Sequence, residues 1–256
     1  MIAVFAALDR ELASLRQRHL RRVRGAGAPS ELRAWAGPGV ILVRTGMGRA
    51  RAQEAAAAVL SDYPVAAALS IGLAGALRGS LEPGEVLLCE LVTAWTGPAE
   101  AGDAPLGPPV PADPGLLGLA EEAARRSGVS YRRGRVLTFP EVVWRPEAKA
   151  RLGRLCGADA VEMESAWVGQ AARERGVPFL VVRAIADPLR DQLPPMPLPA
   201  AASTWTALAW LAAHPWHTPG AVRTAGYVWR AQRNLALVAG ALLRRLSAGP
   251  LPAVAP

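Results

Sequence analysis

The sequence predicts an α/β protein: a three-layer α/β/α sandwich around a mixed central sheet, followed by a C-terminal helical tail. Three observations predict this class. Short apolar runs typical of buried strands alternate with segments of helical spacing through about residue 190. Turns rich in glycine or proline join many of these segments. After residue 187 the alternation stops and prolines become frequent, which indicates a different kind of region.

Composition narrows the function classes. A chain of 256 residues with 51% apolar content can bury one large core. The formal charge is +8, and every basic residue except Lys149 is Arg, a bias that genomic composition explains as easily as function. These residues are scattered and form no aromatic–basic nucleic-acid motif, so we expect no nucleic-acid partner. Cys89 and Cys156 are isolated and the histidines do not cluster with acids, so we expect no metal and no cofactor. The apolar N-terminus is too short for a signal peptide or membrane span, so a cytoplasmic location is expected.

In the first half of the chain, apolar runs predict strands and leucine or alanine spacing predicts helices. The expected strands are Ile2 to Leu8, Val40 to Val43 and Val65 to Ile71, and the expected helices are Leu12 to His19 and Arg49 to Leu60. A turn or hairpin is expected over Arg21 to Glu31. Gly46 and Gly48 resemble a phosphate-cradling loop without its third glycine, or they only shape a tight connection. The small residues at Gly72 to Gly75 follow the third strand, where backbone N–H groups can approach a ligand closely.

The second half continues the alternation. A strand is expected within Pro83 to Val92, then a long surface loop from Thr96 to Pro114, and then a helix to Ser127 with Asp113 as its N-cap. The remaining predicted elements are a strand over Arg135 to Phe139, a helix over Pro146 to Leu155, a helix over Ala166 to Arg175 and a strand over Phe179 to Asp187.

We expect the chain to divide into an α/β domain over 1–199 and a Pro-, Trp- and Arg-rich tail over 200–256. Two helices are expected in the tail, over Ser203 to Ala213 and Ala221 to Leu246, split by a His- and Pro-rich segment. They pack against the domain or a second subunit, or they form an interfacial pair whose Trp and Arg side chains meet a membrane surface.

Four acids stand out by position. Glu162 and Glu164 flank Met163 where a strand runs into a helix, and Asp187 ends the long apolar run. Acids at the ends of buried strands lie where open α/β sheets bind ligands. Glu11 lies at the first strand-to-helix junction, where it is either a solvated first-turn acid or part of the same site.

These motifs resemble those of the purine nucleoside phosphorylase and nucleosidase superfamily. The resemblance rests on Val161-Glu-Met-Glu-Ser-Ala, on Pro178-Phe-Leu-Val-Val-Arg-Ala-Ile-Ala-Asp187 and on Gly72-Leu-Ala-Gly, and it covers about residues 1 to 190. It is greatest to the methylthioadenosine/S-adenosylhomocysteine nucleosidase branch. The Asp-Pro and Leu-Pro-Pro segment with its basic tail also resembles the hopanoid-associated phosphorylase group, whose members are thought to remove adenine from adenosylhopane.

The resemblance implies cleavage of a purine N-glycosidic bond through an oxocarbenium-like transition state. Asp187 would protonate the purine N7, and Glu11 would activate water. The implied substrate-binding residues share the same pocket: Glu164 accepts from the ribose hydroxyls, Met163 packs on the sugar, Glu162 lines the pocket, and Leu73, Ala74, Gly75 and Val142 lie near the base.

The same positions bear on the choice of nucleophile. Ser70 stands where phosphorylases of this superfamily carry an Arg, and Leu73 where they carry a Ser, so water is favoured over phosphate. Arg44 or Arg49 could supply charge from elsewhere, which keeps a phosphorylase as an alternative. A non-catalytic nucleoside-binding or membrane-associated protein is a further alternative. The expected partners are a small-molecule nucleoside, which could be lipid-linked, a second copy of the chain, and a membrane surface met peripherally through the tail.

Overall fold

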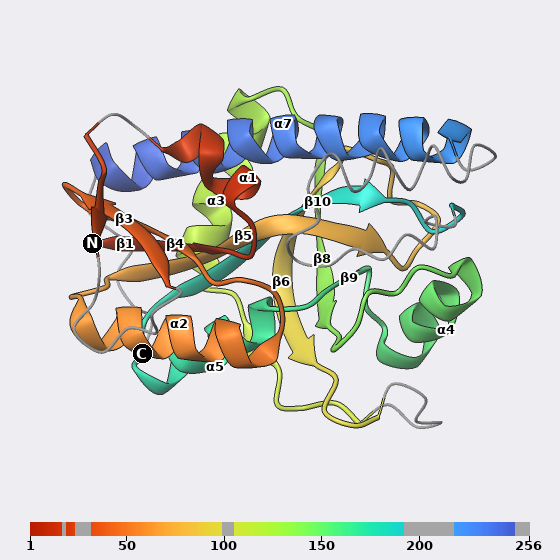
Figure 1. Ribbon diagram of the computed structural model, residues 1–256, viewed down its shortest axis with the longest axis horizontal. Coiled ribbons are helices and arrows are strands. Elements are labelled where there is room, and N and C mark those ends of the chain that lie inside the picture. The colour runs from red at the N-terminus through yellow and green to blue at the C-terminus, as the bar shows by residue number, and fades with distance from the viewer. Residues whose placement is uncertain (17–18, 24–31, 99–104, 192–217, 249–256) are drawn as a thin grey trace.

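The computed structural model describes residues 1–16, 19–23, 32–98, 105–191 and 218–248. A mixed sheet lies between two helical layers, and a long C-terminal helix runs along one of its faces (Figure 1). The three-layer α/β/α prediction is therefore confirmed.

The central sheet has ten strands. They are β1 Ile2–Ala6, β2 Arg21–Val23, β3 Arg33–Gly37, β4 Val40–Arg44, β5 Ala67–Ala76, β6 Val86–Ala94, β7 Val110–Pro111, β8 Tyr131–Thr138, β9 Ala160–Glu162 and β10 Phe179–Asp187. Strand β5 pairs in parallel with β1 and β10 and in antiparallel with β9. Strand β10 also pairs with β6, and β8 joins β6 to β9. The five strands β5, β10, β6, β8 and β9 therefore close into a ring, around which the site is built.

Helices cover both faces of the sheet. They are α1 Asp9–Leu12, the 3₁₀ turn η1 Ala13–Leu15, α2 Arg49–Asp62, α3 Pro114–Arg126, α4 Pro146–Cys156, α5 Ser165–Glu174 and α7 Thr218–Ala248. Helices α2 and α5 share one apolar core with the sheet, while α1, α3 and α7 share the other. Helix α4 packs at the end of the sheet with a smaller core of its own (Figure 1).

Local sequence explains the helix starts. Asp113 caps α3 as predicted: its carboxylate accepts from the backbone N–H of Leu116 at 2.8 Å, and Pro114 follows at the first helical position. Gly46 and Gly48 have φ of +80° and +89°, so the turn before α2 requires glycine at both positions.

Several element boundaries differ from the predictions. Strand β5 continues through Gly72 to Ala76, beyond its predicted end at Ile71, because β10 and then β9 supply its hydrogen-bond partners there. The first helix begins at Asp9 rather than Leu12 and breaks up at η1. The loop after Thr96 contains strand β7 and a bridge between Trp95 and Leu106. The predicted helix over 203–213 lies outside the described residues.

The tail helix α7 packs on its own chain. Side chains spaced three and four residues apart along α7 are buried against the sheet and α3: Ala231, Leu235, Val238, Ala239, Leu242 and Leu246. The described part of the tail thus packs against the domain, the first of its two predicted arrangements. No helix in the described ranges has the length and apolarity needed to cross a bilayer. The division at residue 199 stays a prediction.

Candidate active site

Strand ends bring four acids into one buried region. Glu11 follows β1 on α1, Glu162 ends β9, Glu164 precedes α5 and Asp187 ends β10, and all four side chains are buried. The solvated alternative for Glu11 is therefore wrong. The strands β1, β9 and β10 all pair with β5, β1 and β10 in parallel and β9 in antiparallel. The carboxyl ends of parallel strands are where α/β sheets bind ligands.

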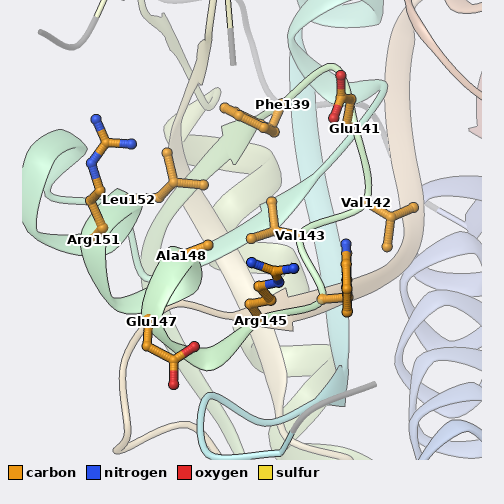
Figure 2. Close-up of a pocket in the computed structure, with 10 residues that line it drawn as sticks. Phe139, Glu141, Val142, Val143, Arg145, Glu147, Ala148, Arg151 and Leu152 are labelled. Atoms are coloured by element: carbon orange, nitrogen blue, oxygen red, sulfur yellow. The ribbon is translucent and has the colours of Figure 1, made fainter. Parts of the chain in front are cut away.

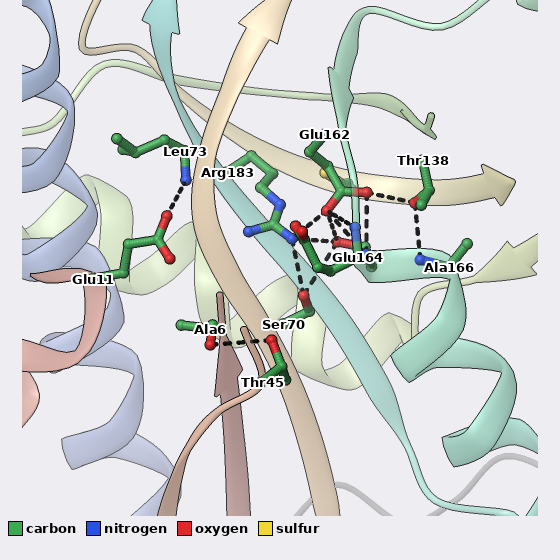
Figure 3. Close-up of polar contacts among 12 residues, drawn as sticks. Ala6, Glu11, Thr45, Ser70, Leu73, Thr138, Glu162, Glu164, Ala166 and Arg183 are labelled. Atoms are coloured by element: carbon green, nitrogen blue, oxygen red, sulfur yellow. Dashed lines mark hydrogen bonds and ion pairs between the residues drawn. The ribbon is translucent and has the colours of Figure 1, made fainter. Parts of the chain in front are cut away.

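Arg183 lies among three of these acids (Figure 3). Its Nη2 donates to Glu162 Oε2 at 2.5 Å, to Ser165 Oγ at 2.6 Å and to Ser70 Oγ at 3.1 Å. Arg183 is 3% exposed, and its Nε has no hydrogen-bond partner among the described residues. A buried cation of this kind is stable only because carboxylates surround it.

Glu162 acts as an anchor for the start of α5. Its carboxylate accepts from the backbone N–H groups of Glu164 at 3.0 Å and Ser165 at 2.9 Å, and from the Thr138 hydroxyl. Together with the Arg183 contact, these donors take up both oxygens. An anion at this position also interacts favourably with the N-terminal end of the helix.

Glu164 is held from the opposite side by the turn before α2. Its Oε1 accepts from the Gly48 backbone N–H at 2.8 Å. The glycine turn that resembles a phosphate loop thus binds a carboxylate of this chain. Burial and the nearby Glu162 charge raise the pKa of Glu164 to about 7.

Glu11 is fixed by two backbone donors. Its Oε2 accepts from the Leu8 N–H at 2.9 Å and its Oε1 from the Leu73 N–H at 3.1 Å. The backbone N–H of Leu73, in the stretch of β5 expected to approach a ligand, therefore donates to the carboxylate of Glu11. Burial raises the pKa of Glu11, an effect that the Arg183 charge opposes. A carboxylate with a raised pKa is a suitable general base near neutral pH.

Asp187 pairs with a buried lysine. Lys149 on α4 places its Nζ 2.6 Å from Asp187 Oδ2, and its side chain is 0% exposed. The other oxygen, Oδ1, is buried without a partner among the described residues. Burial raises the pKa of Asp187 to about 6, although the Lys149 charge lowers it.

Two glycines of β5 make room for these side chains. Gly72 pairs with Arg183 in the β5–β10 register, and Gly75 pairs with Asp187. A Cβ atom at Gly72 would lie 2.1 Å from Arg183 Nη1, and one at Gly75 would lie 3.3 Å from Asp187 Oδ2. The absence of side chains at Gly72 and Gly75 of β5 therefore leaves space for the Arg183 and Asp187 side chains of β10.

The position that carries Arg in phosphorylases is filled by a hydroxyl. Ser70 Oγ lies 3.1 Å from Ser165 Oγ and accepts from Arg183. The two other arginines considered for a phosphate site are engaged elsewhere. Arg44 contacts Asp9 at 3.4 Å, and Arg49 donates to Gln53 at 3.3 Å while its guanidinium stacks on Trp167.

The remaining predicted residues lie around this cluster. Met163 is partly exposed in the bend before α5, and Ala74 is buried in β5. Val142 lies in the loop between β8 and α4, where it lines a cavity of about 580 Å³ with Phe139, Val143, Trp144 and α4 residues (Figure 2). None of the four acids lines that cavity. Helix α4 connects the cavity with the acids, because Ala148 borders the cavity and the next residue, Lys149, pairs with Asp187.

Four residues of the site were not predicted from the sequence: Arg183, Ser165, Thr138 and Lys149. Two signals could have found the cations. Arg183 is the charged residue inside an otherwise apolar buried strand, and Lys149 is the single lysine among 29 basic residues. Thr138 and Ser165 carry no such signal, because hydroxyls are common at strand and helix ends. Among the described residues, no group of three or more acids, histidines or cysteines is arranged to hold a metal ion.

Comparison with known proteins gives relatives with two different names. The chain is 38% identical over 184 residues to futalosine hydrolase of Thermus thermophilus, which covers 65% of this chain and 79% of the relative. It is 30% identical over 200 residues to 5′-methylthioadenosine/S-adenosylhomocysteine nucleosidase of Bacillus cytotoxicus, over 73% and 85% of the two chains.

Solved structures share the fold. The Neisseria meningitidis 5′-methylthioadenosine/S-adenosylhomocysteine nucleosidase, in complex with methylthio-immucillin-A, has a TM-score of 0.75 at 20% identity, covering 96% of this chain and 99% of that one. Native futalosine hydrolase of Helicobacter pylori has a TM-score of 0.73 at 19% identity, covering 96% and 97%. The family model of the phosphorylase superfamily matches residues 1–206. The chain therefore belongs to the phosphorylase superfamily.

Proposed function

We propose that this protein is a nucleosidase that hydrolyses the N-glycosidic bond of a 5′-substituted adenine nucleoside and releases adenine. One observation carries the proposal: a buried carboxyl group, that of Asp187, accompanies two buried carboxylates, Glu11 and Glu164, that share the Arg183 charge. Such a set can protonate a leaving base and stabilise a cationic sugar.

Asp187 supplies the proton for the departing base. Its Oδ1 is the oxygen without a partner, and the burial that raises its pKa to about 6 keeps a useful fraction protonated near neutral pH. Protonation at N7 lets the electrons of the glycosidic bond leave on the purine.

Glu164 and Glu11 act on the sugar. The Glu164 carboxylate accepts from the ribose hydroxyls, and its negative charge stabilises the oxocarbenium-like transition state. Glu11, held by two backbone N–H groups, takes a proton from the attacking water. Met163 packs against the ribose, and Leu73, Ala74, Gly75 and Val142 border the base. Glu162 lines the same pocket while it fixes Arg183.

Water is favoured over phosphate as the nucleophile. A phosphate dianion needs positive charge close to the sugar, and Arg183 already compensates carboxylates there. Ser70 adds no charge. A phosphorylase of the same fold is the first alternative, and a nucleoside-binding protein without activity is the second.

The 5′ substituent has three candidates. The two groups of relatives are named for futalosine and for methylthioadenosine or S-adenosylhomocysteine. Adenosylhopane, a lipid-linked nucleoside of hopanoid biosynthesis, is the third and is suggested by the Pro-rich segment and tail. The protein acts in the cytoplasm on this proposal, as a homo-oligomer such as a homodimer.

Base release tests the function. The purified full chain is incubated with each candidate nucleoside, with and without phosphate, and the free base and the sugar product are measured. Free sugar at a rate independent of phosphate supports a hydrolase. A sugar 1-phosphate that forms only with phosphate supports the phosphorylase. If no candidate or 5′-alkylthio analogue is cleaved, the binding alternative replaces the proposal.

Peripheral membrane contact is proposed for the outer side of α7. Val222 and Trp229 are 66% and 65% exposed, and Arg233 lies over the Trp229 ring at 5.9 Å. Apolar and cationic side chains combined in this way are typical of interfacial helices. Flotation with anionic liposomes should recover the full chain but not a Val222→Ser/Trp229→Ser variant, whose changes lie on exposed positions of α7, and equal recovery of the two would refute the contact.

A further inference from the structure

The Lys149–Asp187 pair extends the proposed function, and the inference rests on that function. We propose that Lys149 is a positioning residue: it holds Asp187 through Oδ2, so that Oδ1 carries the proton for the departing base, and it stabilises the carboxylate left behind. The proton moves from Oδ1 to N7, the glycosidic electron pair stays on the base, and the new carboxylate charge faces an ammonium.

The ammonium of Lys149 has a full set of acceptors. Besides Asp187 Oδ2 at 2.6 Å, its Nζ donates to the backbone carbonyls of Pro188 and Asp191, each at 3.1 Å. Three acceptors match the three N–H bonds of an ammonium group. Lys149 thus fixes both the carboxylate and the turn that follows β10, and a group held at three points has little freedom to rotate away.

Close packing of α4 makes this contact possible. Gly153, one turn after Lys149, lies so close to β5 that a Cβ atom there would be 2.6 Å from the Leu77 carbonyl oxygen. The helix therefore sits directly against the end of β5, beside the end of β10. From this position the lysine stem is fully buried and only its Nζ reaches the polar groups.

The residue type also favours a specific role. Arginine fills all 28 other basic positions, including the buried pair with Glu162, so lysine as the partner of Asp187 departs from the chain's own preference. A guanidinium is larger and planar and binds carboxylates through a two-pronged fork, whereas an ammonium is a compact point charge. A single charge on one oxygen leaves the second oxygen available, which a forked contact would not.

The charges around Asp187 set its protonation. Lys149 on α4 lowers the pKa of the carboxyl against the larger effect of burial, and Asp191 in the following turn raises it. Arg223 of α7 pairs with Asp191 at 3.1 Å and partly offsets that acid. Without Lys149, burial dominates and Asp187 becomes a weaker acid.

Two measurements on the full chain test the proposal. In the first, ¹³C NMR of labelled Asp carboxyls follows the titration of Asp187, assigned with Asp187→Asn, in wild type and in Lys149→Met. The midpoint should rise by at least about one pH unit in the variant, since an ion pair at this distance shifts a carboxyl by about 1–3 units. No substrate is needed, so the result stands even if base release fails.

In the second, kcat/KM for base release is measured against pH. Lys149→Met should lower the maximal rate about 10- to 100-fold and move the optimum to higher pH. Arg154→Met, which removes an exposed cation from the same helix, should do neither. In an Asp187→Asn background, Lys149→Met should cost nothing further, because Lys149 acts through Asp187.

The proposal would be overturned if Lys149→Met changed neither the Asp187 titration midpoint nor the pH optimum. It would also be overturned if Lys149→Met lowered kcat/KM further in the Asp187→Asn background. If Lys149→Met does not fold, Lys149→Ala with added methylamine or ethylamine replaces it. Recovery of activity should then depend on the protonated amine, and equal recovery with uncharged alcohols of the same size would count against the inference. If the Asp187 titration midpoint shifts in Lys149→Met but no nucleoside is cleaved, the nucleosidase proposal is refuted. The electrostatic effect of Lys149 on Asp187 would still be supported.

Discussion

Arg183 occupies the space that a β-carbon of Gly72 would take. The two residues are partners across the β5–β10 register, and a Cβ atom at Gly72 would lie 2.1 Å from Arg183 Nη1 and 3.0 Å from Glu11 Oε1. A missing side chain on one strand thus creates the site for a buried cation on its neighbour, and that cation allows several carboxylates to remain close together.

Gly72→Ala should therefore damage both stability and activity. Overpacking a buried site costs about 1–3 kcal/mol, which corresponds to a fall in Tm of about 2–12 °C for a chain of this size. Base release should fall at least about tenfold because Arg183 and Glu11 are displaced. Gly118→Ala is the matched control, since nothing lies within 4 Å of that position on α3. An unchanged Tm for Gly72→Ala would show that the guanidinium can move without cost.

Arg183→Met should be the most destabilising single change in the cluster. It leaves Glu162 without its cation in a buried site, which costs about 3–5 kcal/mol. Urea unfolding monitored by tryptophan fluorescence measures the free energy. Adding Glu162→Gln to Arg183→Met should restore part of the loss, because the uncompensated charge is removed. Simple additivity of the two changes would contradict direct pairing.

Asp187→Asn and Glu11→Gln test the proposed acid and base. Each should lower kcat about 10²- to 10⁴-fold, the usual contribution of proton transfer by a side chain. Glu54→Gln, on the exposed side of α2, is the control and should leave kcat unchanged. Retention of full activity by both site variants would refute the assigned mechanism.

The pH dependence of kcat/KM should be bell-shaped. The reaction needs Asp187 protonated and Glu164 ionised, and their pKa values are about 6 and about 7. Below about pH 6 Glu164 is mostly protonated, and above about pH 7 Asp187 is mostly ionised, so the maximum lies between these values. Glu164→Gln should lower activity and change the position of the acidic limb, which then reports the protonation of Glu11, whose pKa is also raised by burial. A wild-type profile flat from pH 5 to pH 9 would be inconsistent with this pair.

Helix α7 should be a structural part of the fold. Leu242→Ala removes a fully buried side chain from the core between α7 and the sheet and should cost about 2–5 kcal/mol. Leu237→Ala, at 42% exposure on the same helix, should cost much less. Equal unfolding free energies for the two variants would indicate that α7 detaches in solution.

The sequence predicted the element types well and the strand ends less well. Apolar runs identified the strands because burial on both faces demands such runs. The end of β5 was missed, since Gly72 to Gly75 have the composition of a turn and extend as strand only because β10 and β9 pair with them. Pairing partners distant in sequence leave no local signal.

The candidate acids were predicted from position and family resemblance, and the structure brings them into one buried region. What holds them there was not predicted. The backbone N–H groups of Gly48 and Leu73 bind Glu164 and Glu11, and any residue other than proline could supply such a donor.

The sequence by itself determined the α/β class, the apolar strands, and which acids end them, because these depend on residue type and spacing. Only the tertiary structure decided which charges meet. In the sequence, Arg183 and Lys149 are two of 29 basic residues, and residue type alone does not show that they contact acids. Their effect depends on burial and on distances to Glu162 and Asp187 of a few ångströms, where electrostatic interactions are strong. Such distances arise when strands and helices far apart in the chain pack together.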